Sequence, residues 1–172
     1  MSKMKQAVIV LFLFIIATVV NAASPNQVCF TPGEDCTHLI VMTIAEAKQT
    51  VYVQAYSFTS KVIADALVDA RIRGVDVEVI LDKSQGIKNK YSLVPYFLNN
   101  HIETWIDYKP AIAHNKVMII DKAVVITGSF NFTKSAQFNN AENLLIIHDT
   151  NLAMQYLANW NKRQAQSRMP LD

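Results

Sequence analysis

Residues 113–133 read Ala-His-Asn-Lys-Val-Met-Ile-Ile-Asp-Lys-Ala-Val-Val-Ile-Thr-Gly-Ser-Phe-Asn-Phe-Thr. This stretch contains two apolar runs, 116–120 and 123–127, whose β-branched composition is typical of buried strands. Only Asp121 and Lys122 separate the two runs. The pattern therefore predicts a tight hairpin in the middle of a sheet.

The segments on either side of this hairpin alternate between helix and strand patterns. Ser60 is placed as the N-cap of one helix, and Gly74 closes it. In chain order we expect a helix at 38–48, a strand at 50–56, a helix from 60 to 74, a strand at 75–81, a helix at 92–100, a strand at 102–106, the hairpin, a strand at 143–147 and a helix from 152 to about 164. This alternation predicts one α/β domain over residues 23–172.

The start of the chain has a different character. Lys3 and Lys5 precede an uninterrupted apolar run, 7–20, and small residues follow at Asn21 and Ala22. This order predicts a secretory signal peptide over residues 1–22, and hence a periplasmic or secreted protein. An uncleaved membrane anchor is the alternative, although the run is shorter than the ~20 residues that span a bilayer.

Cys29 and Cys36 flank a Pro-Gly turn just after this signal. In an oxidising compartment, a disulfide that closes the turn is expected. Two unpaired thiols are the alternative, and a zinc site would need further ligands at a suitable spacing, which the sequence does not offer.

The charge of the chain does not by itself indicate a polyanionic partner. The sequence has 16 basic and 14 acidic residues, and removal of Lys3 and Lys5 brings the balance to zero. Affinity for nucleic acid must therefore come from a local basic patch. The lysines at 83, 88 and 90 form either such a phosphate-contacting loop or a solvated loop.

Four polar residues near the hairpin suggest phosphodiester chemistry. Residues two apart in a strand share a face, so His114 and Lys116 are expected to project together. An imidazole can attack phosphorus, and an ammonium can neutralise the non-bridging oxygens. Ser129 and Asn131, after the next strand, would add neutral donors to the same oxygens. Together these residues predict an anion cradle.

Two carboxylates complete the set of candidate catalytic residues. Asp121 has the wrong parity for the cradle and lies at the predicted turn, which favours a structural role over direct catalysis. Glu142 opens the following strand and is expected to accept the second ring N–H of His114, which would fix the tautomer. A carboxylate at the rim of the site is the alternative for Glu142.

His114, Lys116, Asp121, Gly128, Ser129 and Asn131 together resemble the HKD motif of the phospholipase D superfamily. Residues 30–160 are similar to the small one-motif bacterial endonucleases of that superfamily, the Nuc type. The resemblance implies a mixed central sheet flanked by helices and a phosphohistidine intermediate on His114. It also implies phosphate binding by Lys116, Ser129 and Asn131, support of His114 by Glu142, and no metal or other cofactor.

The motif occurs once, whereas larger relatives carry two copies. Double displacement needs a second group that protonates the leaving oxygen and later activates water. None of His38, His101 and His148 is followed two residues later by lysine. We therefore expect a homodimer with its active site at the subunit interface.

Three functions compete at this point. The first is an endonuclease that acts on DNA, with RNA as the alternative substrate. Its sequence specificity is expected to be low, because no base-reading element is evident. The second is a phospholipase D or cardiolipin-type phosphodiesterase. The third, a metal-dependent His-Asn nuclease, lacks a cluster of hard-metal ligands. Aromatic residues near the motif either stack on bases or belong to the core; they are Tyr56, Phe58, Phe130 and Phe132.

Overall fold

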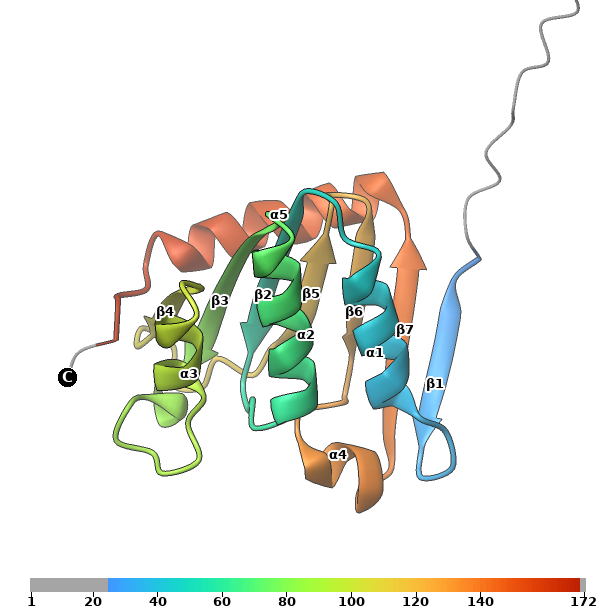
Figure 1. Cartoon of the computed structure of the whole chain (residues 1–172), viewed down its shortest axis with the longest axis horizontal. Helices are drawn as coiled ribbons and strands as arrows, with labels where there is room; N and C mark the ends of the chain where they lie inside the picture. The colour runs from blue at the N-terminus through green and yellow to red at the C-terminus, as the bar shows by residue number, and fades with distance from the viewer. Residues whose placement is uncertain (1–24, 171–172) are drawn as a thin grey trace, which may run out of the picture.

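The computed structural model describes residues 25–170, which form one seven-stranded sheet with helices on both faces (Figure 1). The expected signal peptide lies outside the described residues. In chain order the elements are β1 (Gln27–Thr31), α1 (Cys36–Ala45), β2 (Thr50–Ala55), α2 (Lys61–Ile72), β3 (Asp76–Asp82), the 3-10 helix η1 (Lys83–Gln85), α3 (Val94–Asn99), β4 (Glu103–Asp107), β5 (Lys116–Ile120), β6 (Val124–Gly128), α4 (Lys134–Phe138), β7 (Glu142–His148) and α5 (Thr150–Gln164).

The strand order is β1-β7-β6-β5-β2-β3-β4. β2, β3 and β4 run parallel to one another because helices α2 and α3 return the chain across the sheet. The other neighbouring pairs are antiparallel, including the predicted β5–β6 hairpin. The expected α/β fold with a mixed central sheet is confirmed.

Helices α1, α2 and α3 cover one face of the sheet, and α5 crosses the other (Figure 1). Side chains of β5 alternate between the two faces, as strand parity requires. Met118 belongs to the core under α1 and α2, whereas Val117 and Ile119 belong to the core under α5. Trp160 fastens α5 to the sheet, because its indole N–H donates to the main-chain oxygen of Val53 at 2.9 Å.

Local signals explain where the longer helices begin and end. Ser60 caps α2 by accepting from the main-chain N–H of Ile63 at 3.4 Å, and Gly74 follows the helix with a φ of 90°. Both roles were predicted from the sequence. Among the described residues no helix has the length and apolar character needed to cross a membrane.

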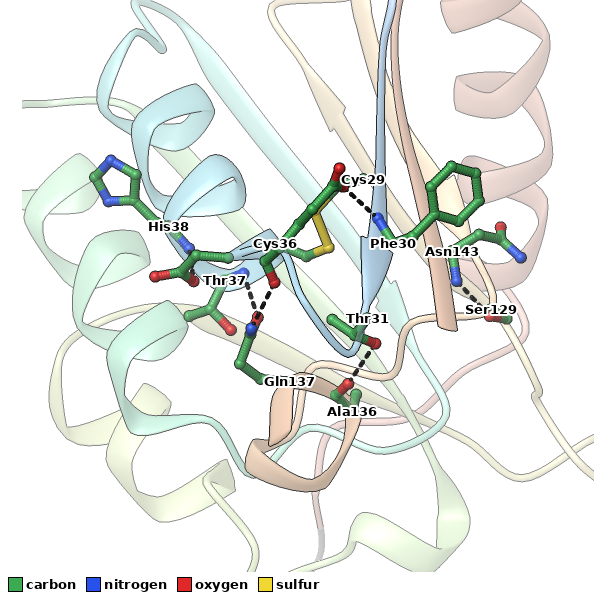
Figure 2. Close-up of a disulfide and its surroundings, with 12 residues drawn as sticks. Cys29, Phe30, Thr31, Cys36, Thr37, His38, Ser129, Ala136, Gln137 and Asn143 are labelled. Carbon is green, nitrogen blue, oxygen red and sulfur yellow. Dashed lines mark hydrogen bonds between the residues drawn. A yellow bond between two sulfur atoms is a disulfide. The ribbon is translucent and has the colours of Figure 1, made fainter. Parts of the chain in front are cut away.

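Three elements were not predicted: β1, α4 and the short 3-10 helix η1. The segment around the cysteines was expected only to turn, but Gln27–Thr31 forms an edge strand on β7, with Thr31 opposite Glu142. A disulfide between Cys29 and Cys36 joins β1 to α1 (Figure 2). The hydroxyl of Thr31 donates to the main-chain oxygen of Ala136 in α4 at 2.8 Å, so the disulfide loop packs against that helix.

The strand directions bring many loops to one edge of the sheet, drawn at the bottom of Figure 1 and called the lower edge below. β2, β3, β4 and β6 end at the lower edge, and β5 and β7 begin there. Loops at strand ends are where catalytic groups gather in sheets of this kind. The residues of the motif, apart from Asp121, lie at this edge; they are His114, Lys116, Gly128, Ser129 and Asn131.

Candidate active site

His114 lies at the lower edge, two residues before β5 begins at Lys116. The Nζ atom of Lys116 is 3.1 Å from Nε2 of His114 and also donates to the main-chain oxygen of His114 at 3.1 Å. His114 is exposed, whereas Lys116 is only 7% exposed. When Lys116 donates to Nε2, that nitrogen holds a lone pair, which is the form of imidazole that can attack phosphorus.

Residues of β2 and the loop after it hold the segment that carries His114. The main-chain N–H of Tyr56 donates to the main-chain oxygen of Asn115 at 2.7 Å, and the buried side chain of Gln54 donates to the Asn115 amide oxygen at 3.1 Å. The Tyr56 ring lies 4.6 Å from the His114 ring, measured between centroids, and 5.3 Å from Nζ of Lys116. The Tyr56 ring therefore lies beside both His114 and Lys116 in the site.

The sequence did not assign this place to Tyr56, because it depends on the pairing of β2 with β5, which no local pattern reveals. The other three aromatic residues of the same group are fully buried, as expected for a core. They are Phe58, Phe130 and Phe132.

Gly128 ends β6 with a φ of 147°, and a Cβ at this position would lie 2.3 Å from the main-chain oxygen of Asn143. Only glycine permits this close approach of β6 to β7. The turn presents Ser129, whose hydroxyl donates to Glu142 at 2.6 Å. The same hydroxyl accepts from the main-chain N–H of Asn143 at 3.0 Å, as Figure 2 shows. Because a hydroxyl has one proton, Ser129 must release Glu142 before it can donate to a phosphate.

The expected bond from the His114 ring to Glu142 does not form within the described chain. The carboxylate of Glu142 instead accepts from Ser129 and from the side chain of Asn140, the latter at 2.9 Å. The reason is sheet order: β6 lies between β5 and β7, so Glu142 starts ~10 Å from β5. The orienting role predicted from the sequence is therefore not fulfilled inside one chain.

Asn131 lies in the loop between β6 and α4, between the fully buried rings of Phe130 and Phe132. Its Oδ1 atom is buried and has no hydrogen-bond partner among the described residues. An unpartnered buried amide oxygen costs about 1–3 kcal/mol. An amide oxygen only accepts, so the phosphate contact expected of Asn131 would have to come from its NH2 group.

Burial lowers the pKa of the Lys116 ammonium, and the carboxylate of Glu142 opposes part of this effect. The charge is therefore held in a place where the fold alone disfavours it. A phosphate oxyanion would supply the missing counter-charge, and the reduced solvent screening would strengthen that contact.

Asp121 lies at the opposite edge, five residues further along β5 than Lys116 and therefore roughly 16 Å away. Its carboxylate accepts three main-chain N–H bonds, from Lys48 at 2.8 Å, Gln49 at 2.7 Å and Thr50 at 2.9 Å. Asp121 therefore does not lie among the groups that surround His114 in this structure. The structural alternative, a bond to turn backbone, is the one that the geometry supports.

We expect Asp121→Ala to lower the free energy of unfolding by about 2–4 kcal/mol, because three main-chain donors lose a charged acceptor. The kcat of the folded variant should match the wild type. Asp121→Asn is the matched control, since asparagine tolerates the φ of 51° at this position and keeps one acceptor oxygen. Urea denaturation and initial rates measure the two effects. A large fall in kcat with unchanged stability would restore a catalytic role.

Metal ligands gather at one place in residues 25–170, where Cys29, Glu34 and Cys36 approach one another. Both sulfurs are used in the disulfide, so this group does not fit a metal ion. The neighbours of His114 are an ammonium, a phenol ring and amides, and this donor set does not fit a divalent cation either.

Comparison with known proteins agrees with this geometry. The chain matches the family model described as "Cardiolipin synthase, PLD-like domain" over residues 40–163. Phospholipase D of Rickettsia prowazekii is 48% identical over 139 residues, which cover 81% of this chain and 67% of that protein. Human mitochondrial cardiolipin hydrolase is 29% identical over 130 residues, or 76% of this chain and 51% of that protein.

Solved structures give the same assignment. Nuc from Salmonella typhimurium superposes with a TM-score of 0.80 at 37% identity, covering 84% of this chain and 97% of Nuc. NucT from Helicobacter pylori has a TM-score of 0.79 at 28% identity, covering 84% and 98% of the two chains. The fold and the His-Lys site thus define a hydrolase of phosphodiesters. The chain belongs to the phospholipase D superfamily, and its relatives include Nuc-type proteins.

Proposed function

We propose that this phosphodiesterase is a metal-independent endonuclease of low sequence specificity that cleaves DNA or RNA through a phosphohistidine on His114. The observation that carries the proposal is the 3.1 Å contact between Nζ of Lys116 and Nε2 of His114 at an open edge of the sheet. The similarity to Nuc over nearly the whole of that chain supports a nuclease of the same kind.

In the proposed reaction, Nε2 of His114 attacks phosphorus, and the bond to the leaving oxygen breaks after that oxygen takes a proton from an acid. Water then attacks the phosphorus of the phosphohistidine and gives a proton to the same group. The P–N bond breaks, which frees His114 and leaves a terminal phosphate on the substrate fragment. Lys116 neutralises the non-bridging oxygens, and Asn131 and Ser129 donate to them. Glu142 acts indirectly, because its carboxylate accepts from the Ser129 hydroxyl and so positions it.

The acid in this scheme is proposed to be His114 of a second copy of the chain. Among the other histidines, His101 and His148 lie at the edge of the sheet opposite the lower edge, and His38 lies on α1. Large apolar side chains are exposed at the lower edge, with Ile112 58% and Phe138 66% exposed. A twofold partner that covers this edge would bury such groups and bring the two His114 rings together.

A lipid phosphodiesterase is the second candidate. Relatives named phospholipase D share 47–48% identity with the chain, and the same exposed Ile112 and Phe138 would suit an acyl chain beside the site. The phosphate cradle accepts any phosphodiester, so substrate choice depends on the surroundings.

We also propose that the protein is exported and keeps residues 23–172 after loss of the signal peptide. The Cys29–Cys36 disulfide supports export, because such bonds persist in oxidising compartments such as the periplasm.

The deciding experiment assays the protein without residues 1–22 on plasmid DNA, RNA and phospholipid vesicles, each with and without EDTA. We expect cleavage of nucleic acid that EDTA does not reduce, and no cleavage by a His114→Ala preparation made in the same way. Hydrolysis of the vesicles with intact DNA would select the lipid candidate, and loss of DNA cleavage in EDTA would select a metal-dependent mechanism.

A further inference from the structure

A polar pocket of about 620 Å³ opens at the lower edge, on the same side of the sheet as the ends of β3 and β4. It lies where β3 and β4 end, and its lining includes Lys83, Ser84, Lys88, Asn89 and Tyr108. Sheet order places it two to three strand spacings from β5, which corresponds to ~10–14 Å from the His114 segment. The pocket and the cradle therefore share the lower edge without overlapping.

The lysines of the pocket form no ion pair within residues 25–170. No acidic residue occurs between Asp82 and Glu103 in the sequence. The ion pairs within residues 25–170 are Lys61–Asp65 and Arg163–Asp107, so neither Lys83 nor Lys88 takes part in one. Lys83 donates to the main-chain oxygen of Pro110 at 3.1 Å, which fixes its ammonium and leaves further protons for a ligand.

The loop that carries these lysines is held by internal bonds. The side chain of Asn89 donates to the main-chain oxygen of Ser84 at 2.9 Å, and the hydroxyl of Ser92 donates to the main-chain oxygen of Gln85 at 2.6 Å. The Gln85 side chain is buried and accepts from the main-chain N–H of Phe58 at 3.3 Å. These bonds argue against the alternative of a purely solvated loop.

One buried carboxylate joins this loop to the nucleophile. Asp82, which is 2% exposed, accepts from the main-chain N–H of Ser84 at 2.9 Å and from that of Ala113 at 2.7 Å. Ala113 immediately precedes His114. The fold therefore fixes the distance between the pocket and the segment that carries His114.

We propose that Lys83, Lys88 and Tyr108 form a subsite for the backbone of a polynucleotide strand, at a distance from the scissile phosphate. The lysines bind phosphates, and Tyr108, which is 42% exposed, offers a flat face to a base or sugar. This inference rests on the proposed nuclease function and names how that site selects long, repeating polyanions.

The test compares kcat/KM of Lys88→Ala and of Lys83→Ala/Lys88→Ala with the wild type on bis(p-nitrophenyl) phosphate and on single-stranded oligonucleotides of increasing length. We expect the loss to grow with length, to reach about 5–10-fold per lysine on long substrates at low salt, and to be smallest on the chromogenic diester, which cannot reach the pocket. The slope of log KM against log salt should decrease by about one per lysine removed.

Lys48→Ala is the matched control, because Lys48 is exposed at the opposite edge of the sheet; it should behave as the wild type. Lys88→Gln, which keeps part of the aliphatic stem and a polar end without the charge, guards against a folding defect. A loss that is equal on every substrate, or absent on all of them, overturns the subsite while the nuclease stands. A wild-type protein that hydrolyses the chromogenic diester but no oligonucleotide overturns the nuclease itself.

Discussion

Replacement of His114 by alanine is expected to lower kcat at least ~10⁴-fold, because the nucleophile of a double displacement cannot be bypassed. The side chain is exposed, so the free energy of unfolding should hardly change. Wild-type protein quenched during turnover should carry one fragment of the substrate, joined to His114 through its phosphoryl group and a P–N bond. Mass spectrometry under alkaline conditions should detect this adduct, and the variant should carry none.

The same variant tests whether the working site contains two chains. Wild-type and His114→Ala chains are mixed in known ratios, unfolded and refolded together, and assayed. If each site needs two histidines, activity follows the square of the wild-type fraction, so an equal mixture retains about a quarter of full activity. A linear dependence, with about half of the activity retained in the equal mixture, would show that each chain works alone. Asp121→Asn chains mixed in the same way serve as the control, since they should not dilute activity.

Lys116→Met is expected to lower kcat/KM about 10²–10³-fold and, at the same time, to raise the melting temperature. Methionine has nearly the same shape but no charge to bury. Because the pKa of Lys116 is lowered in the folded protein, the unfolded chain binds the proton more readily, and the charged group destabilises the fold at neutral pH. Lys116→Met therefore removes the buried charge, which raises stability, and also removes the phosphate contact, which lowers kcat/KM.

The pH dependence of the free energy of unfolding provides a test of this prediction. The wild-type free energy of unfolding should rise as the pH increases from the lowered pKa of Lys116 toward the ordinary value of 10.5, and the advantage of Lys116→Met should shrink over that interval. Urea titrations of both proteins at several pH values measure it. An advantage that grows with pH, or a variant less stable at neutral pH, would contradict the assignment.

Local patterns predicted those parts of the molecule that local forces determine. The hairpin, the Ser60 cap and the shared face of His114 and Lys116 follow from strand parity and capping, and each of these is present. The turn after β5 is one residue longer than predicted, because β6 begins at Val124.

Long-range pairing determined what the sequence missed. Gln27–Thr31 becomes a strand only because β7 offers it a partner, and Tyr56 reaches His114 only because β2 pairs with β5. The position of Glu142 depends on the strand that lies between β5 and β7. None of these neighbours is visible in a window of a few residues.

The pairing of β1 with β7 has a consequence for the order in which the molecule folds. Thr31 near the start of the chain lies opposite Glu142, more than a hundred residues later, and Asn143 holds Ser129 at the same edge. Contacts so distant in sequence form late, after the loop between them has closed. The edge strand β1, although it is synthesised first, can therefore join the sheet only after β7 has been made.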